Sequence, residues 1–256
     1  MDFLDLGLSE KTVKAIKEFG IEKPTTVQVD VIPSILQGKD IFTIAPGGCG
    51  KTISYVLPLI DIISREQKQS ILIMTSDSQK SVMISDNLAT LNRFHEESED
   101  DKDGENGSDV VIGSPDLLMD LVKEGQLDLS GINILVVDDI NLIKKNKQIK
   151  NMEKLLEMMP ADKQNIVYTT RRSRETQSIL DKILKAPEEI KVDKNKEQEA
   201  SLATPAPEAG KTENKPSLAA KNSYPDKEAL ALSKKYNSFQ GKTPQFLLNK
   251  VDLASD

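Results

Sequence analysis

Apolar residues along the chain gather in two kinds of segment that alternate. Short, almost wholly apolar runs occupy residues 41–44, 71–74, 110–112, 132–137, 166–168 and 190–192. Between them, Ile, Leu and Met recur at three- and four-residue spacings within residues 53–64, 79–94, 116–123, 152–159 and 174–184. The first kind is typical of buried strands and the second of amphipathic helices. The alternation predicts an α/β fold with a parallel sheet flanked by helices.

Capping residues sharpen the predicted helix boundaries. A first helix is expected over residues 9–19, ending at Gly20. Ser114 followed by Pro115 predicts the start of a later helix, and Ser173 predicts another, because a serine oxygen can accept from the free N–H groups of a first turn.

Two segments depart from the alternation. Residues 96–108 are crowded with Glu, Asp, Gly, Asn and Lys, which indicates a solvated loop. Residues 193–222 are rich in Lys, Glu, Ala, Pro and Ser, a composition that cannot offset the entropy cost of folding. We therefore expect one domain over residues 1–192 and a largely disordered tail over 193–256. A short helix at 226–236 could dock or remain mobile.

Composition limits the partners of the chain. Its 34 basic and 41 acidic side chains leave a net charge of -7, so nucleic acid could be contacted only locally. There is one cysteine, the first residues do not form a secretory signal, and no apolar run approaches the roughly 20 residues of a membrane span. These features predict a soluble protein without a membrane partner, most simply a cytoplasmic one.

A glycine-rich segment follows the first predicted strand and precedes a predicted helix. It reads Ala45-Pro46-Gly47-Gly48-Cys49-Gly50-Lys51-Thr52 and has the spacing of a phosphate-binding P-loop. Glycines let the backbone N–H groups approach phosphate, Lys51 can reach the β and γ phosphates, and Thr52 can hold Mg²⁺. We expect all eight residues to bind nucleotide. A glycine-rich turn without a ligand is the alternative, and Cys49 is expected to be only a small side chain.

A second motif lies upstream of this loop. Phe3, followed by Gly20-Ile21-Glu22-Lys23-Pro24-Thr25-Thr26-Val27-Gln28, closely resembles the Q motif of DEAD-box RNA helicases. The resemblance implies a RecA-like domain and assigns Gln28, with Thr25, to the binding of ATP, since an amide can both donate to and accept from adenine. Alternatively, Gln28 is an ordinary helix residue after a helix start at Pro24 and Thr25.

The segment Asp138-Asp139-Ile140-Asn141 follows a predicted strand where that family has Asp-Glu-Ala-Asp. The resemblance implies that Asp138 orients Mg²⁺ and that Asp139 takes the place of the catalytic glutamate. Asp139 is one methylene shorter, and a displacement of about 1 Å can cost on the order of 10²-fold in rate. The alternative is that these acids merely cap a strand end.

The family's RNA-binding elements are eroded. The arginines of two such elements are missing from residues 75–80 and 114–117, and residues 169–171 read Thr-Thr-Arg where the family has Ser-Ala-Thr. Basic clusters at 144–150 and 171–174 could meet phosphates, although solvated helix faces are the favoured interpretation. RNA therefore stays a weakly supported partner.

The resemblance covers the first RecA-like domain alone, and residues 193–256 are not expected to fold into a second one. That domain supplies an arginine finger worth roughly 10³ to 10⁵ in rate. The leading hypothesis is an ATP-binding, nucleotide-dependent module of RNA metabolism with little or no hydrolysis. The alternatives are an RNA-dependent ATPase completed by a partner chain or a second copy, and an interaction protein with a relic P-loop.

Overall fold

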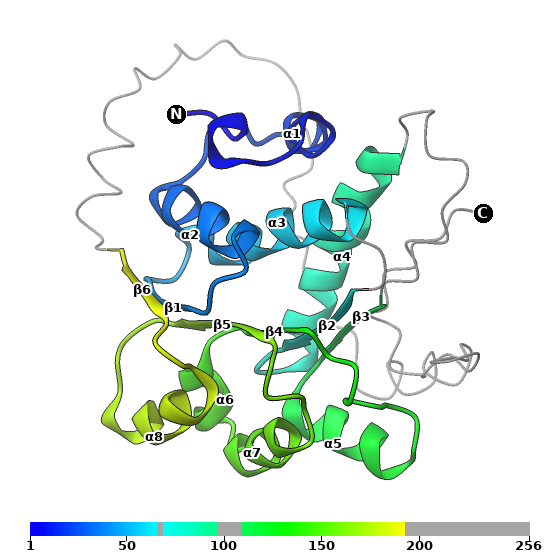
Figure 1. The fold of residues 1–256 in the computed structure, drawn as a ribbon, viewed down its shortest axis with the longest axis vertical. Helices are drawn as coiled ribbons and strands as arrows, with labels where there is room; N and C mark the ends of the chain where they lie inside the picture. The colour runs from blue at the N-terminus through cyan, green and yellow to red at the C-terminus, as the bar shows by residue number, and fades with distance from the viewer. Residues whose placement is uncertain (66–68, 97–108, 193–256) are drawn as a thin grey trace, which may run out of the picture.

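A six-stranded parallel sheet forms the centre of the molecule. The computed structural model describes residues 1–65, 69–96 and 109–192. The strand order is β3-β2-β4-β5-β1-β6, and all neighbours pair in parallel (Figure 1). The strands are β1 (Ile41–Ile44), β2 (Ser70–Met74), β3 (Asp109–Gly113), β4 (Ile134–Val137), β5 (Gln164–Thr169) and β6 (Glu188–Lys191).

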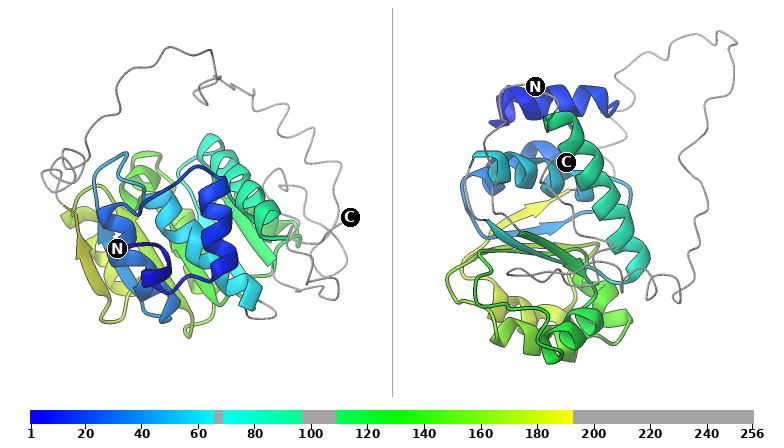
Figure 2. Two further views of the ribbon diagram at one scale, coloured as in Figure 1. Left: turned by 90° about the horizontal axis from the view of Figure 1, so that it is seen from above. Right: turned by 90° about the vertical axis from the view of Figure 1, so that its right-hand side faces the viewer.

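Helices cover both faces of this sheet. A short 3-10 helix, η1, spans Leu4–Leu6, and the helices of one layer are α1 (Glu10–Glu18), α2 (Thr26–Leu36), α3 (Lys51–Arg65) and α4 (Ser78–Glu96). The other layer holds α5 (Pro115–Lys123), α6 (Ile140–Lys145), α7 (Ile149–Glu157) and α8 (Arg174–Ile183). Figure 2 shows the two layers on opposite sides of the sheet.

The strands other than the edge strand β6 are apolar on both faces because each contributes side chains to two cores. In β4, Ile134 and Val136 belong to the core beneath α1 to α4, whereas Leu135 and Val137 belong to the core beneath α5 to α8. Alternate side chains of a strand point to opposite faces, so a run of four apolar residues satisfies both layers. The predicted α/β fold is confirmed.

Parallel strands bring their carboxyl ends to one edge of the sheet, where ligands bind in open α/β folds. The P-loop follows β1, residues 75–80 follow β2, residues 138–141 follow β4, and residues 169–171 begin at the last residue of β5. These four strands are neighbours in the order β2-β4-β5-β1, so the topology collects the candidate motifs at one edge.

Some element boundaries differ from the sequence prediction. The strand predicted at 132–137 begins at Ile134, and the one predicted at 190–192 is Glu188–Lys191, because pairing with β1 extends it into polar residues. The short α6 was not predicted, since six residues are too few to show a helix period. Helix α4 runs to Glu96, where the loop was expected to begin.

The remaining predicted features fall on other parts of the chain. Residues 97–108 of the acidic segment and the tail 193–256, with its predicted helix at 226–236, lie outside the described residues. Among the helices that are described, none is both long enough and apolar enough to cross a membrane.

Candidate nucleotide-binding site

The P-loop turns from β1 into α3 through two glycines in the left-handed region. Gly48 has φ 85° and Gly50 has φ 89°, a conformation that L side chains rarely adopt. A Cβ added to Gly47 or Gly48 would meet nothing within 4 Å, so the backbone of these residues faces open space. Helix α3 begins at Lys51, and its free N–H groups and dipole favour an anion there.

Lys51 lies over the loop that precedes it. Its ammonium donates to the carbonyl oxygens of Ala45 and Pro46, each at 2.8 Å. The buried Cys49 thiol lies 3.1 Å from the same Pro46 oxygen, which places its side chain inside the loop. These two contacts leave the third N–H of the Lys51 ammonium for a phosphate.

The two residues of the upstream motif that are predicted to bind ATP lie behind the P-loop. The Thr25 hydroxyl donates to the carbonyl oxygen of Cys49 at 3.0 Å, and the Gln28 amide donates to that of Gly50 at 3.4 Å. Gln28 also accepts from the Thr25 N–H at 3.0 Å, forming a capping box at the start of α2. Both side chains brace the loop, and the adenine contact of Gln28 stays a prediction.

Asp138, at the end of β4, is buried and held by two donors. Its Oδ2 accepts from the Tyr55 hydroxyl at 3.2 Å and lies 3.3 Å from the Lys80 ammonium. Burial, followed by the charge of Asp138, raises the pKa of Tyr55 well above its ordinary value, so the phenol remains a donor. Lys80 also donates to the Thr52 hydroxyl at 3.1 Å.

Asp139 caps the helix that follows it. Its backbone is left-handed, with φ 68°, and its Oδ1 accepts from the N–H groups of Asn141 and Leu142 at 3.2 and 3.4 Å. Burial is the main cause that raises the pKa of this carboxyl. One oxygen of this carboxylate is thus engaged by its own helix, and the catalytic role of Asp139 stays a prediction.

Asn141 joins two of the motifs at this edge. Its amide donates to the Thr169 hydroxyl and to the Arg171 carbonyl oxygen, both at 2.7 Å. Asn141 carries no charge, where the similar family motif has an aspartate, and its amide links residues 138–141 to residues 169–171.

The predicted basic clusters are partly paired with acids. Lys144 forms an ion pair with Glu175, and Arg172 pairs with Glu189 at 2.8 Å while its guanidinium lies 5.6 Å from the centre of the Phe42 ring. These pairs reduce the positive charge that either cluster can offer to a phosphate backbone.

A cavity of about 660 Å³ opens where these motifs meet. Its lining comes from the P-loop, the start of α4 and the segment after β4: Gly47, Gly48, Gly50, Lys51, Thr52, Ile53, Ser76, Asp77, Gln79, Lys80, Met83, Asn87, Asp138, Asp139, Leu142 and Thr170. Thr25 and Gln28 do not line it. Of the predicted site residues, the structure brings together the glycines, Lys51, Thr52, Asp138 and Asp139.

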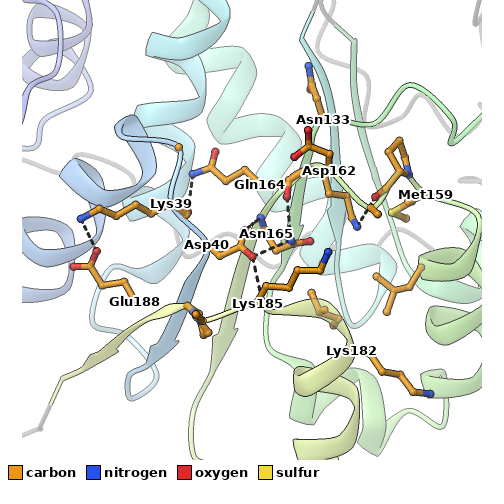
Figure 3. Close-up of a pocket in the computed structure, with 18 residues that line it drawn as sticks. Lys39, Asp40, Asn133, Met159, Asp162, Gln164, Asn165, Lys182, Lys185 and Glu188 are labelled. Carbon is orange, nitrogen blue, oxygen red and sulfur yellow. Dashed lines mark hydrogen bonds and ion pairs between the residues drawn. The ribbon is translucent and has the colours of Figure 1, made fainter.

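A larger cavity, of about 970 Å³, lies at the opposite edge of the sheet (Figure 3). Its lining includes Asp40, Asn133 and Gln164, which stand at or just before the amino ends of β1, β4 and β5. Ligands of parallel α/β sheets bind at the carboxyl ends, and no helix that follows a strand directs its N-terminus here. The smaller cavity is therefore the better candidate site.

Thr52 and Asp138, the predicted Mg²⁺ ligands, have suitable oxygen donors. The ammonium of Lys80 bridges them, however, at 3.1 and 3.3 Å. Magnesium requires oxygens at about 2.0 to 2.1 Å, which a cation already in contact with both oxygens opposes. As arranged, the pair does not form an open Mg²⁺ site.

Sequence reasoning missed Lys80 and Tyr55. A signal for Lys80 was present: it lies in the first turn after β2, and β2 neighbours β4, whose end carries Asp138. A lysine there can reach a carboxylate at the same edge. Tyr55 is completely buried inside an apolar helix face, so its sequence context predicts only core packing.

Comparisons with known proteins agree on one family. The model of the family described as DEAD/DEAH box helicase matches residues 25–178. The chain is 27% identical over 203 residues to the ATP-dependent RNA helicase DeaD of Escherichia coli, covering 74% of the chain and 32% of that protein. It is 28% identical over 196 residues to the RNA helicase CrhR of Synechocystis, covering 72% and 40% respectively.

Two solved structures show a similar fold. A DEAD box protein from Methanococcus jannaschii matches with a TM-score of 0.68 and 25% identity, over 77% of this chain and 57% of that one. A hypothetical ATP-dependent RNA helicase from Sulfolobus tokodaii matches with a TM-score of 0.63 and 24% identity, over 72% and 57%. The chain thus spans well under two thirds of each of these relatives.

Proposed function

This chain belongs to the DEAD/DEAH box helicase family, and we propose that residues 1–192 act as an ATP-binding module that hydrolyses ATP slowly or not at all. The family implies the use of ATP and usually Mg²⁺. The observation that supports the proposal is a contrast at one edge of the sheet. The P-loop has all its phosphate-binding residue types, and Thr25 and Gln28 donate to its carbonyl oxygens. Asp139, which takes the place of the catalytic glutamate, instead caps its own helix.

Binding follows from the loop. The backbone of Gly47 and Gly48 and the first turn of α3 would hold the phosphates, and Lys51 would supply a positive charge. A charged hydrogen bond contributes roughly 1.5 to 3 kcal/mol, so Lys51 is worth about 10- to 100-fold in affinity.

Weak hydrolysis follows from the position of Asp139. A general base must lie within hydrogen-bond reach of the water whose proton it takes. One oxygen of Asp139 is bonded to two backbone N–H groups, and the side chain is one methylene shorter than that of a glutamate, so its other oxygen would reach less far toward an attacking water. Bound ATP would then mark the nucleotide-bound form of the module rather than supply energy through hydrolysis. The module would act in RNA metabolism, in the cytoplasm.

The second candidate is an RNA-dependent ATPase whose second RecA-like domain comes from another polypeptide or a second copy. One observation favours it: the Asn141 amide still joins residues 138–141 to residues 169–171. Those segments would have to move together if hydrolysis were coupled to RNA.

Calorimetric titration of ATP into the full chain tests binding. Lys51→Ala is expected to weaken it by about 10- to 100-fold. The matched control is Lys39→Ala, which removes a lysine paired with Glu188 at the opposite edge and should leave ATP affinity unchanged. Absence of binding by the wild-type chain would reject the module and leave an interaction protein with a relic P-loop.

Gln28→Ala separates two roles of that residue. If Gln28 reads adenine, the substitution should erase a preference for ATP over GTP; if it only braces the loop, both nucleotides should weaken equally. Phosphate release, measured with and without RNA and with a candidate partner added, should stay negligible. Strong RNA stimulation would favour the second candidate instead.

A further inference from the structure

Three elements meet at the ammonium of Lys80. The lysine lies in the first turn of α4, Thr52 lies in the first turn of α3, and Asp138 follows β4. The Lys80 ammonium donates to the Thr52 hydroxyl at 3.1 Å and lies 3.3 Å from the Asp138 carboxylate. The same two oxygens are those expected to hold Mg²⁺.

The backbone fixes Lys80 in this place. Its own N–H donates to the Asp77 carboxylate at 2.9 Å, which holds the first turn of α4 against the end of β2. Strand β2 pairs directly with β4, with Met74 opposite Val137, so the residue after Val137 lies within reach of a lysine stem from α4. The contact is a product of the topology.

Electrostatics keep the ammonium there. Asp138 is only 3% exposed, and burying a carboxylate without a cation is costly. Lys80 is the cation in contact with it, while Tyr55 adds a neutral hydrogen bond. A divalent ion entering between Thr52 and Asp138 would have to displace this ammonium and would meet repulsion from it.

Lys80 also faces the expected phosphate position. It lines the same cavity as Gly47, Gly48 and Lys51. An ammonium has three donors, and its contacts with Thr52 and Asp138 use two of them. The cavity therefore presents two lysines to a bound anion, one from the P-loop and one from α4.

We propose that Lys80 is a tethered cation that takes the place of Mg²⁺ between Thr52 and Asp138, so that this chain binds nucleoside triphosphate without a divalent ion. The inference rests on the proposed function, since it concerns the same nucleotide site. It specifies how the triphosphate charge is neutralised: by two side-chain ammonium groups and the start of α3. A fixed monovalent cation also lacks the Lewis acidity of a metal, which agrees with weak hydrolysis.

Calorimetric titration of ATP into the full chain, once in EDTA and once in MgCl₂, tests the inference. Wild type is expected to bind in both buffers, with dissociation constants within about threefold of each other. Lys80→Met keeps the length of the stem but removes the charge. It should weaken binding in EDTA by about tenfold or more, as the loss of a charged contact predicts. Addition of Mg²⁺ should then restore most of the affinity.

Mn²⁺ provides a second readout that does not depend on turnover. With ADP present, electron paramagnetic resonance should detect protein-bound Mn²⁺ in Lys80→Met and little in wild type. Lys39→Met, which removes a lysine paired with Glu188 at the other edge, is the matched control and should behave as wild type in both assays.

The outcomes separate the two proposals. Wild-type binding that appears only with Mg²⁺ would overturn the tethered cation while leaving the ATP-binding module intact, and this result needs no variant to fold. Equal metal dependence in wild type and Lys80→Met would also overturn it. Absence of wild-type binding in both buffers would overturn the module and the inference together.

Discussion

The two cavities at opposite edges of the sheet differ in volume and in chemistry, and the smaller one is the candidate site. The amino-edge cavity measures about 970 Å³ and the carboxyl-edge cavity about 660 Å³. At the amino edge, polar side chains of the lining contact one another: Lys39 pairs with Glu188, and Asp40 accepts from the backbone and side chain of Asn165 (Figure 3).

At the carboxyl edge, the cavity is lined by the P-loop backbone and by lysines and aspartates that follow the strands. The Lys51 ammonium donates to two carbonyl oxygens of the loop, and Lys80 bridges a hydroxyl and a buried carboxylate. Left-handed backbone occurs at both edges, in Gly48 and Gly50 here and in Gly38 and Ala186 at the amino edge, so it does not separate the two cavities. The direction of the strands and the chemistry of the lining, rather than volume, therefore distinguish a binding site from a structural hollow.

The largest expected effect comes from Gly50→Ala. A Cβ at Gly50 would lie 2.7 Å from the Gln28 amide nitrogen and 3.0 Å from the Thr25 hydroxyl oxygen, in a backbone with φ +89°. We expect a loss of about 3 kcal/mol in the free energy of unfolding, from strain and from the displaced brace. ATP binding should fall by more than tenfold. Urea unfolding and calorimetry measure the two effects.

Gly131→Ala is the matched control for this change. A Cβ there meets nothing within 4 Å, and Gly131 is not among the glycines with positive φ. Stability and ATP affinity should both stay near wild type. If Gly50→Ala also left ATP affinity unchanged, the brace of the loop by Thr25 and Gln28 would be irrelevant to binding.

Asp40→Ala is expected to affect stability alone. It removes the acceptor of the Asn165 N–H at 2.7 Å and leaves the amide of this buried asparagine with fewer partners. Lost hydrogen bonds to a charged group predict a destabilisation of about 2 kcal/mol by urea unfolding. ATP affinity should be unchanged in conditions where the variant is folded. A clear drop in ATP affinity would mean that the amino edge takes part in binding, and it would contradict the assignment of the site to the carboxyl edge.

The sequence predicts the fold well because the fold depends on a repeated pattern. Each buried strand is a short apolar run, and the long helices other than α2 show their period. The candidate site is predicted as far as its residues are neighbours along the chain, as in the loop from Ala45 to Thr52. Lys80 was missed because its partners, Thr52 and Asp138, lie 28 and 58 positions away, and only the β2–β4 pairing brings them together.

Local context also failed to show what Gln28 and Asp139 contact. The capping box of Thr25 and Gln28 could be foreseen from a threonine three residues before a glutamine, but the contacts with the Cys49 and Gly50 carbonyls depend on the packing of α2 against the loop. Asp139 is followed by residues with no helix period, so its role as the cap of α6 was not predicted.

The smallest predicted effect concerns Asp139 and pH. Burial raises the pKa of this carboxyl in the folded chain above the ordinary value of about 3.9 that it has when unfolded. Between the two pKa values the folded chain holds more protons than the unfolded chain, so its stability falls as pH rises through this window, and the charge remains a cost at pH 7.

Asp139→Asn removes that charge. Asparagine can still accept from the Asn141 and Leu142 N–H groups, and it tolerates the positive φ of 68°. We expect its thermal midpoint to exceed that of wild type by about 1 to 3 °C at pH 7, and the gap to close toward about pH 4. Asp139→Ala loses the cap and should be less stable than wild type at both pH values. If Asp139→Asn were instead the less stable chain at pH 7, the carboxylate charge would be stabilising the folded chain, as it would if a cation such as Lys51 dominated its surroundings.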